Sequence, residues 1–391
     1  MRFSALAAAA LLLFSQTADA ATCGGNFNNF LTELKAEAIA KGHSRQVVNR
    51  FFQTATLDPN VIRRDRAQGI FKSTFTDFAG KVISKNRMDH GRNNARKYKS
   101  VFDQAERTYG VDRNVILAFW ALETDYGAFQ GDINTANALI TLAHDCRRPE
   151  LFRPQIFAAI DLYERDDFDP ASTTGAWAGE IGMVQMLPED ILHLGVDGDG
   201  DGHINVKTSA PDALLSGAHM LQNLGWRAGE PWLVEVSVPG NLDWFETGLE
   251  TQKSVRDWAR LGVKPTHGNM PDGGLSASIL LPQGRFGPAF MALPNFRVYF
   301  EWNQSFVYVT TAAYFATRLA GAPVFSRGNP EVGLSDGEMK ALQQKLRARG
   351  HDVGKIDGIL GSGTRAAVRL EQRRLRMPAD AWPTRALLSK L

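Results

Sequence analysis

The chain has few cysteines, almost no net charge and no long apolar run. Cys23 and Cys146 are its two cysteines, so one disulfide is the most that a single chain can form. Lys and Arg number 44 against 42 Asp and Glu, which gives no electrostatic argument for a nucleic-acid partner. No segment approaches about eighteen consecutive apolar residues, so we expect no transmembrane span. Apolar residues at 44% and charged residues at 22% are typical of an ordinary globular protein.

The N-terminus has the layout of a secretory signal peptide. Arg2 precedes an apolar run over residues 5–14, and Ala18-Asp19-Ala20 forms a small-x-small cleavage site before Ala21. A buried N-terminal helix is the alternative, but the order of charge, apolar run and small residues favours a signal peptide over residues 1–20. We therefore predict that the mature protein works outside the cytoplasm.

Both cysteines would then enter an oxidising compartment, in which a disulfide persists. The sequence cannot place two Cα atoms within bonding range, so it leaves a bond between Cys23 and Cys146 open. Lipidation is a second use for Cys23, but Ala20 and Thr22 fit poorly with the usual leucine-containing lipidation pattern. We therefore expect no lipid anchor at Cys23.

Helical periodicity dominates the chain. Apolar residues recur at helical spacing through 27–100, and further helices are predicted over 212–224 and 308–319. Residues 236–300 instead carry irregular Pro and Gly punctuation, which favours loops and short strands. The sequence therefore predicts a mainly α (α+β) protein.

A small C-terminal module follows a break in this pattern. Residues 326–334 have no periodicity and contain Gly and Pro, as expected of a linker. Ser335 and Glu338 form a capping box at the start of one helix, and a second helix begins near Thr364. We predict a separate domain with a minimal core over residues 335–391.

Glu123 is the strongest candidate for a catalytic group. It lies near the end of the most hydrophobic helix. The sequence predicts that this helix starts near an N-cap at Asp112, runs over residues 115–124 and closes at Gly127 as a C-terminal cap. Desolvation and the partial negative charge of a helix C-terminus both raise the pKa of a carboxyl toward the range of a general acid. A surface Glu in the last turn is the simpler alternative, so neighbouring motifs have to decide.

The segment Gly175-Ala-Trp-Ala-Gly-Glu-Ile-Gly-Met-Val-Gln-Met-Leu-Pro188 supplies that context. Its glycines allow close approach of the backbone, Trp177 offers a flat face for a sugar, and Gln185 offers an amide for a hydroxyl or acetamido group. Taken singly, such glycines are more often turn formers and such a Trp more often belongs to a core. The prediction therefore depends on the combination with Glu123.

In this order, Glu-x-x-x-Gly from Glu123 and Gly-x-x-Gln-x-x-Pro some fifty residues later resemble the lysozyme-like catalytic core of lytic transglycosylases. The chain from about residue 30 to 320 is similar to the membrane-bound lytic transglycosylase B type, which implies a lysozyme-like catalytic domain over 21–325. Further matching stretches are Cys146-Arg-Arg-Pro-Glu-Leu-Phe152, Val196-Asp-Gly-Asp-Gly-Asp-Gly-His-Ile-Asn205, Pro211-Asp-Ala, Gly225-Trp226, Leu293-Pro-Asn-Phe296, Trp302-Asn303 and Tyr308.

The resemblance makes Glu123 the sole catalytic acid/base. Asp125, two positions further on, lies on a different helical face and cannot share this task. The resemblance places three residues along the substrate cleft and identifies an Arg pair that meets the substrate. Together with Trp177, the predicted substrate-binding residues are Arg147, Arg148, Gln185, Asn303 and Tyr308.

Three positions depart from the family pattern. Family members commonly have Ser where this chain has Ala176, Phe where it has Met186 and Tyr where it has Trp302. A hydroxyl or phenol is therefore missing from the expected cleft, whereas the acid itself is unaffected.

An acidic loop that begins at residue 197 matches the first half of an EF-hand calcium site, with oxygen ligands at alternating positions before a Gly turn. Thr208 replaces the usual Glu at the twelfth position, and related enzymes close a longer loop with a later Asp. A calcium-free acidic turn remains an alternative because fewer carboxylates weaken a site, and glycoside cleavage itself needs no cofactor. The predicted ligands of a structural Ca²⁺ are Asp197, Asp199, Asp201, His203 and Asp212.

The tail resembles the small three-helix peptidoglycan-binding domain found at the ends of many wall enzymes. Asp357-Gly358 is locally a tight turn, so no binding residue is assigned there. The matching residues are Leu342-Gln343, Gly350, Lys355-Ile-Asp-Gly358, Gly361 and 364–372.

Together these features predict a periplasmic lytic transglycosylase. The resemblance implies that Glu123 protonates the oxygen between N-acetylmuramic acid and N-acetylglucosamine, and then draws the proton from the C6 hydroxyl to close a 1,6-anhydro ring. The alternatives are a lysozyme-type muramidase with a second carboxylate, and a non-catalytic wall-binding scaffold. We expect a monomer that binds peptidoglycan glycan strands, alone or with other wall enzymes.

Overall fold

The computed structural model describes residues 21–67 and 73–391. The predicted signal peptide over residues 1–20 lies outside the described residues. Within the described ranges, no helix has both the length and the apolar character needed to cross a membrane.

The fold is mainly helical, which confirms the predicted class. Seventeen α-helices occur in the described part of the chain, and the strands are short. The helices are α1 Phe27–Ala40, α2 Arg45–Phe51, α3 Pro59–Arg66, α4 Phe75–Val82, α5 Lys85–Lys97, α6 Lys99–Tyr109, α7 Arg113–Thr124, α8 Thr135–His144, α9 Pro149–Glu164, α10 Pro188–Leu194, α11 Ala210–Asn223, α12 Val255–Arg260, α13 Pro294–Trp302, α14 Phe306–Leu319, α15 Asp336–Ala348, α16 Ser362–Arg374 and α17 Arg385–Lys390. The strands are β1 Ile133–Asn134, β2 Thr174–Gly175, β3 Leu233–Ser237, β4 Lys253–Ser254, β5 Lys264–Pro265, β6 Ser276–Leu280 and β7 Phe290–Ala292.

The region predicted to hold loops and short strands forms an antiparallel sheet with the strand order β4-β6-β7-β3-β5. All three residues of the central strand β7 are buried: Phe290 and Ala292 belong to the large helical core, whereas Met291 packs in a second cluster with the fully buried Trp258 of α12. The indole of Trp258 donates a hydrogen bond of 2.9 Å to the carbonyl of Ala277 in β6. One face of the sheet therefore packs on the helical core, and the other forms a small core with α12.

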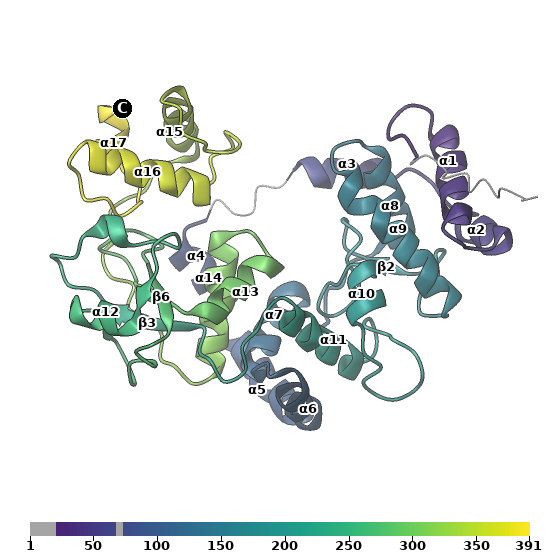
Figure 1. The fold of residues 1–391 in the computed structure, drawn as a ribbon, viewed down its shortest axis with the longest axis horizontal. Helices are drawn as coiled ribbons and strands as arrows, with labels where there is room; N and C mark the ends of the chain where they lie inside the picture. The colour runs from purple at the N-terminus through teal and green to yellow at the C-terminus, as the bar shows by residue number, and fades with distance from the viewer. Residues whose placement is uncertain (1–20, 68–72) are drawn as a thin grey trace, which may run out of the picture.

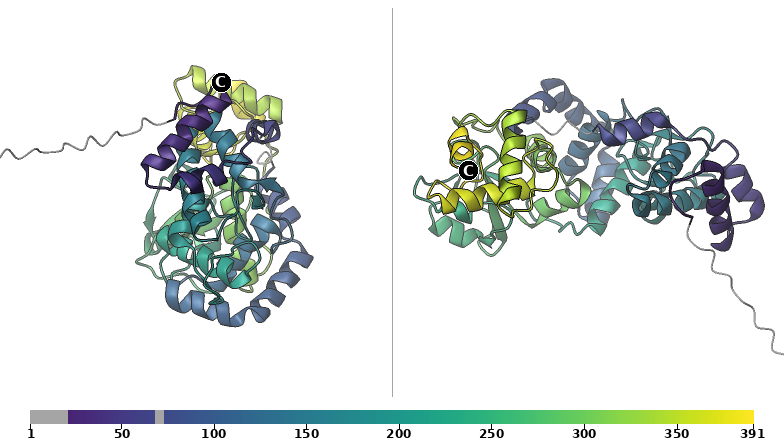
Figure 2. Two further views of the ribbon diagram at one scale, coloured as in Figure 1. Left: turned by 90° about the vertical axis from the view of Figure 1, so that its right-hand side faces the viewer. Right: turned by 90° about the horizontal axis from the view of Figure 1, so that it is seen from above.

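The molecule is elongated, with the sheet and the N-terminal helices at opposite ends (Figure 1). Helices α1 and α2 lie with α8 and α9 at one end, and α7, α11, α13 and α14 occupy the middle (Figure 1). Seen from above, the same order holds, and the C-terminal tail lies at the sheet end (Figure 2). Helix α7 packs against α5, α6, α11 and α14, which places it at the centre of the helical core.

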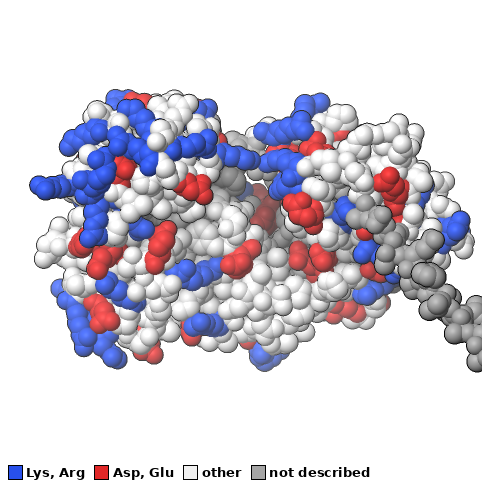
Figure 3. Space-filling model, turned by 45° about the horizontal axis from the view of Figure 1, so that its top comes forward, with Lys and Arg blue, Asp and Glu red and all other residues white. Residues whose placement is uncertain are grey.

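The tail is a three-helix unit with a core of its own. The capping box is confirmed, because Ser335 Oγ accepts from the N–H of Glu338 while the Glu338 carboxylate accepts from the N–H of Ser335. The tail carries twelve Lys and Arg against six Asp and Glu, and basic side chains gather over it at the upper left of Figure 3. The buried core residues of the tail are Met339, Leu342, Leu346, Val353, Ala367, Val368 and Leu387.

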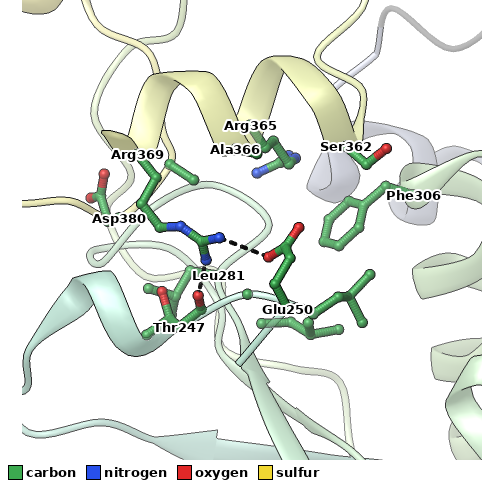
Figure 4. Close-up of a pocket in the computed structure, with 13 residues that line it drawn as sticks. Thr247, Glu250, Leu281, Phe306, Ser362, Arg365, Ala366, Arg369 and Asp380 are labelled. Atoms are coloured by element: carbon green, nitrogen blue, oxygen red, sulfur yellow. Dashed lines mark hydrogen bonds and ion pairs between the residues drawn. The ribbon is translucent and has the colours of Figure 1, made fainter. Parts of the chain in front are cut away.

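The tail is docked on the sheet end of the body. On α16, Arg369 donates 2.8 Å to the carboxylate of Glu250 and also binds the carbonyl of Thr247 (Figure 4). Asp380 accepts 3.0 Å from the backbone N–H of Arg285. The segment 326–334 has neither helix nor strand, and the carbonyl of Glu331 accepts 2.8 Å from the Trp382 indole of the tail.

Candidate functional site

Helix α7 delivers Glu123 to the site. Asp112 caps its N-terminus as predicted, because the Asp112 carboxylate accepts 2.7 Å from the N–H of Asn114. The helix ends at Thr124, as predicted, but its C-terminal cap is Asp125 and not Gly127. Asp125 (φ 51°) and Tyr126 (φ 61°) both adopt the left-handed conformation directly after Thr124.

Two contacts hold this unusual helix end. The Asp125 carboxylate pairs with Arg87 Nε on α5 at 2.8 Å, and the Tyr126 hydroxyl donates 2.8 Å to the carbonyl of Arg87. A non-glycine residue in the left-handed region costs free energy. The two contacts offset this cost and so stabilise the turn after Glu123. The Asp125 carboxylate is thereby engaged with a cation.

Glu123 is half-buried and receives two hydrogen bonds on one oxygen. Trp302 Nε1 donates to Glu123 Oε1 at 2.9 Å, and the Tyr308 hydroxyl donates to the same Oε1. Burial raises the pKa of Glu123 to about 7, and the charge of Glu180 adds to this rise, while the two hydrogen bonds oppose it. The carboxyl is therefore poised to hold a proton near neutral pH, as a general acid requires.

Trp302 supplies a donor where the sequence suggested that a phenol was missing. Its indole stacks on Phe119 of α7, with ring centroids 4.3 Å apart, and this contact points Nε1 toward Glu123. Burial also raises the pKa of Tyr308 well above its usual value, so this hydroxyl keeps its proton and remains a donor. The departure at position 302 thus changes the chemistry of the donor and retains a hydrogen bond.

The Gly-rich segment packs directly on the end of α7. Thr124 Oγ1 donates 2.6 Å to the carbonyl of Met183, and the β1–β2 pair joins residues 133–134 to residues 174–175. At Gly182 (φ 80°) an added Cβ would lie 2.3 Å from the carbonyl oxygen of Val206, so this close approach requires glycine. The segment is therefore fixed relative to Glu123.

The other predicted substrate-binding residues near Glu123 make contacts within the protein: two bind the local backbone and one packs on the helical core. Gln185 (φ 56°) uses its amide to donate 2.8 Å to the carbonyl of Gly182. Asn303 Oδ1 accepts 2.9 Å from the N–H of Ser305, and half-buried Trp177 packs on the helical core. Among the described residues, no hydrogen bond joins Gln185, Asn303 or Trp177 to Glu123, whereas Tyr308 makes one directly.

The Arg pair is held by a carboxylate that the sequence analysis missed. Arg147 and Arg148 both form ion pairs with Asp65 of α3, whose side chain is buried, while each Arg remains about one third exposed. Cys146, directly before the pair, is joined to Cys23 by a disulfide with a Cα–Cα distance of 5.1 Å. The disulfide that the sequence left open is formed, and the Cys23 thiol is therefore not free for lipidation.

Glu180 is a second carboxylate of the site that no sequence signal identified. It lies within the Gly-rich segment, and burial raises its pKa. Its Oε2 is buried without a hydrogen-bond partner among the described residues. At position 176, where the family pattern has Ser, the Ala176 N–H donates 2.8 Å to the carbonyl of Glu180. Met186, the other departure, is fully buried in the core.

The acidic loop gathers three of the predicted metal ligands. The carboxylates of Asp197, Asp199 and Asp212 lie within 4.8 Å of one another, and Asp212 is fully buried. Two other predicted residues lie outside this group. Asp201 accepts 2.8 Å from the N–H of His203, and the His203 ring contacts Asp167 at 3.0 Å. An oxygen-only group of this kind suits Ca²⁺.

Comparison with known proteins agrees with this geometry. The chain matches the family model described as "Transglycosylase SLT domain" over residues 26–317 and "Putative peptidoglycan binding domain" over residues 335–391. It is 28% identical over 228 residues to membrane-bound lytic murein transglycosylase B of Escherichia coli (strain K12), a match that spans 58% of this chain and 62% of that relative.

Two solved structures extend the comparison. SltB3 from Pseudomonas aeruginosa, in complex with NAG-NAM-pentapeptide, is similar with a TM-score of 0.86 and 34% identity, over 94% of this chain and 100% of that chain. Slt35 of Escherichia coli, in complex with calcium, has a TM-score of 0.66 and 25% identity, over 77% of this chain and 96% of that chain. The chain therefore belongs to the SLT-domain family of lytic transglycosylases and carries a peptidoglycan-binding domain at its C-terminal end.

Proposed function

We propose that this protein cleaves the β-1,4 bond between N-acetylmuramic acid and N-acetylglucosamine in peptidoglycan, with Glu123 as the single acid/base and 1,6-anhydro-N-acetylmuramic acid as product. The family assignment supports a peptidoglycan-cleaving enzyme. The observation that carries the assignment of Glu123 is that this half-buried carboxyl has a pKa of about 7 and accepts hydrogen bonds from Trp302 and Tyr308.

The two donors fix where the proton of Glu123 resides. Both bind Oε1, so the proton of the neutral acid sits on Oε2, the oxygen that neither Trp302 nor Tyr308 contacts. In the first step, Oε2 gives this proton to the bridging oxygen, and the substrate's acetamido group stabilises the anomeric cation. Trp302 and Tyr308 then stabilise the carboxylate that has formed.

The carboxylate performs the second step as a base. It takes the proton of the C6 hydroxyl of the same muramic acid, and that oxygen bonds to the anomeric carbon in place of water. Glu123 thereby regains its proton, and the leaving N-acetylglucosamine carries the first one. No second carboxylate is needed, in contrast to the usual pair of a glycoside hydrolase.

A muramidase is the second candidate, and Glu180 is the observation that favours it. The charge of Glu180 acts on Glu123, so a second carboxyl does lie near the acid. However, its Oε2 is buried without a hydrogen-bond partner among the described residues, which does not suit a nucleophile or base that has to meet substrate or water. Glu180→Gln should therefore still give anhydro products.

The supporting residues complete the proposal. We assign substrate contacts to Arg147, Arg148, Trp177, Gln185, Asn303 and Tyr308. The buried Asp65 binds both guanidinium groups of the Arg pair. Each guanidinium remains partly exposed and can bind anionic groups of the wall. A basic tail fits the same polymer, whose stem peptides carry carboxylates.

A structural Ca²⁺ fits the acidic loop. Asp197, Asp199 and Asp212 would hold it, and the ion would neutralise three converging carboxylates and order the loop next to the Gly-rich segment. Catalysis itself would need no cofactor. If the site binds Ca²⁺, adding the ion to chelated protein raises the melting temperature, and Asp199→Asn reduces this rise.

We propose that the domains are a signal peptide over residues 1–20, a catalytic domain over 21–325, a linker over 326–334 and the tail over 335–391. The mature protein would act as a monomer in the periplasm, without a lipid anchor. The experiment that tests the function is digestion of purified sacculi by the wild type and Glu123→Gln, with muropeptides resolved by mass. Loss of anhydro products in the variant, with sacculus binding retained, supports an enzyme, whereas unchanged digestion contradicts it.

A further inference from the structure

The first turn of α14 touches the C-terminal tail on one side and Glu123 on the other. Tyr308 donates its hydrogen bond to Glu123 from this turn. Phe306 lines a cavity between the body and α16, and Val307 lines a second one together with Met339 of α15. The three residues of the turn, Phe306 to Tyr308, are each less than a tenth exposed. This turn is therefore packed between the tail and the candidate acid.

Arg365 is the tail residue that holds Phe306. It projects from α16, and its guanidinium carbon lies 4.5 Å from the centroid of the Phe306 ring (Figure 4). Its Nη2 also donates 2.8 Å to the carbonyl of Pro282. Burial lowers the pKa of Arg365 to about 10, so the group is still a cation at neutral pH. A desolvated guanidinium binds an aromatic face more strongly than an exposed one.

A compact corner links Phe306 to both donors of Glu123. Trp302 is the last residue of α13, and Ser305 caps α14. The N–H of Ser305 donates 2.9 Å to Asn303 Oδ1, and Ser305 Oγ accepts 3.3 Å from the N–H of Tyr308. Because these bonds stiffen the corner, a displacement of Phe306 is transmitted to Tyr308 and Trp302.

We propose that Arg365 is a positioning residue for Glu123. By clamping Phe306, it fixes the corner that presents Trp302 and Tyr308, so that docking of the tail completes the arrangement around the acid. The tail then has a role beyond holding the enzyme on its polymer. This inference rests on the proposed function, because it deepens the role of the same site.

The test compares two Arg variants on a soluble substrate. Arg365→Met removes the clamp, and Arg373→Met is the matched control, because Arg373 also projects from α16 and stacks on a body aromatic, Phe245, at 4.0 Å. Phe245 lies in the short 3-10 helix Trp244–Glu246 and is not part of the corner formed by residues 302–308. The substrate is a short soluble glycan oligomer, and the enzyme is full-length. A weaker attachment to insoluble wall therefore cannot lower the measured rate.

Arg365→Met should lower kcat about tenfold with KM nearly unchanged, since sub-ångström misplacement of catalytic groups costs rate rather than binding. The titratable groups that act on Glu123 are Tyr308 on α14 and Glu180 on the Gly-rich segment. Weaker donation by Tyr308 removes stabilisation of the carboxylate, so the high-pH limb of kcat/KM should move to higher pH. Arg373→Met should leave both kcat and the pH profile as in the wild type.

A second variant protects the test against misfolding. Phe306→Leu removes the aromatic face and should reproduce the loss in kcat, and the double variant with Arg365→Met should be no slower than either single one. Equal kcat and pH profiles for Arg365→Met and the wild type would overturn the inference, as would an equal loss in Arg373→Met. Glu123→Gln is run alongside: if it keeps turnover, the proposed function fails, whereas an inactive Glu123→Gln with a normal Arg365→Met refutes the clamp alone.

Discussion

Replacing Glu123 by Gln should stabilise the folded protein, and increasingly so as pH rises. Burial raises the pKa of Glu123 from 4.5 to about 7 in the folded state, whereas the unfolded chain ionises near 4.5. Below pH 4 both states hold the proton, so the carboxyl costs no stability there. As pH rises toward 7 the unfolded state releases its proton first, and folding becomes progressively less favourable.

The size of the effect follows from the two pKa values. Their difference of about 2.5 corresponds to about 3 kcal/mol at pH 8, a cost that the neutral amide of Glu123→Gln avoids. For a unit of about 300 residues this amounts to a rise in melting temperature of about 5 °C. The rise should be close to zero at pH 4.

The assay is thermal unfolding of the wild type and Glu123→Gln at pH 4, 6 and 8, followed by circular dichroism. Asp125→Asn is the matched control, because it neutralises a neighbouring carboxylate that pairs with Arg87. It should not raise the melting temperature at pH 8. A constant difference between the wild type and Glu123→Gln across the pH range, or a less stable variant at pH 8, would refute a desolvated Glu123.

Three further predictions concern the surroundings of the acid. Glu180→Gln removes a charge that raises the pKa of Glu123, so the high-pH limb of kcat/KM should move to lower pH, and an unmoved limb would contradict this. Trp302→Phe removes a donor to the carboxylate, which should move that limb upward and lower kcat about tenfold, while Trp302→Tyr should restore part of the rate. Replacing Cys23 and Cys146 by Ser removes a disulfide between residues that are 123 positions apart. This should lower the free energy of unfolding, measured in urea, by up to about 5 kcal/mol, and an unchanged midpoint would show that the bond is dispensable.

Local sequence rules predicted the elements better than their contacts. The N-cap at Asp112 and the capping box at Ser335 depend on residues within one helical turn, and both are confirmed. The last helical residue, Thr124, was also predicted, but the cap is Asp125 and not Gly127, because the Arg87 side chain, 38 residues away in sequence, pairs with Asp125. The order of the strands in the sheet likewise depends on long-range pairing, which the positions of Pro and Gly do not predict.

The site shows the same limit. The burial of the helix that carries Glu123 could be predicted because its centre is apolar on every side, but the choice of Glu123 as the acid needed the neighbouring motifs and the family resemblance. The donor role of Trp302 required the stacking of its ring on Phe119, and the Arg pair required Asp65, some eighty positions earlier. The role of Glu180 could not be predicted from the sequence, because Glu180 acts on Glu123 only once the Gly-rich segment is folded next to α7.

The most direct test of the account is digestion of sacculi in water labelled with heavy oxygen, followed by mass analysis of the muropeptides. If Glu123 takes the proton of the C6 hydroxyl and water is excluded, the muramic acid products are anhydro sugars that carry no label. Label at the reducing end of muramic acid, released at a rate that depends on Glu123, would contradict the account and show that the enzyme is a hydrolase.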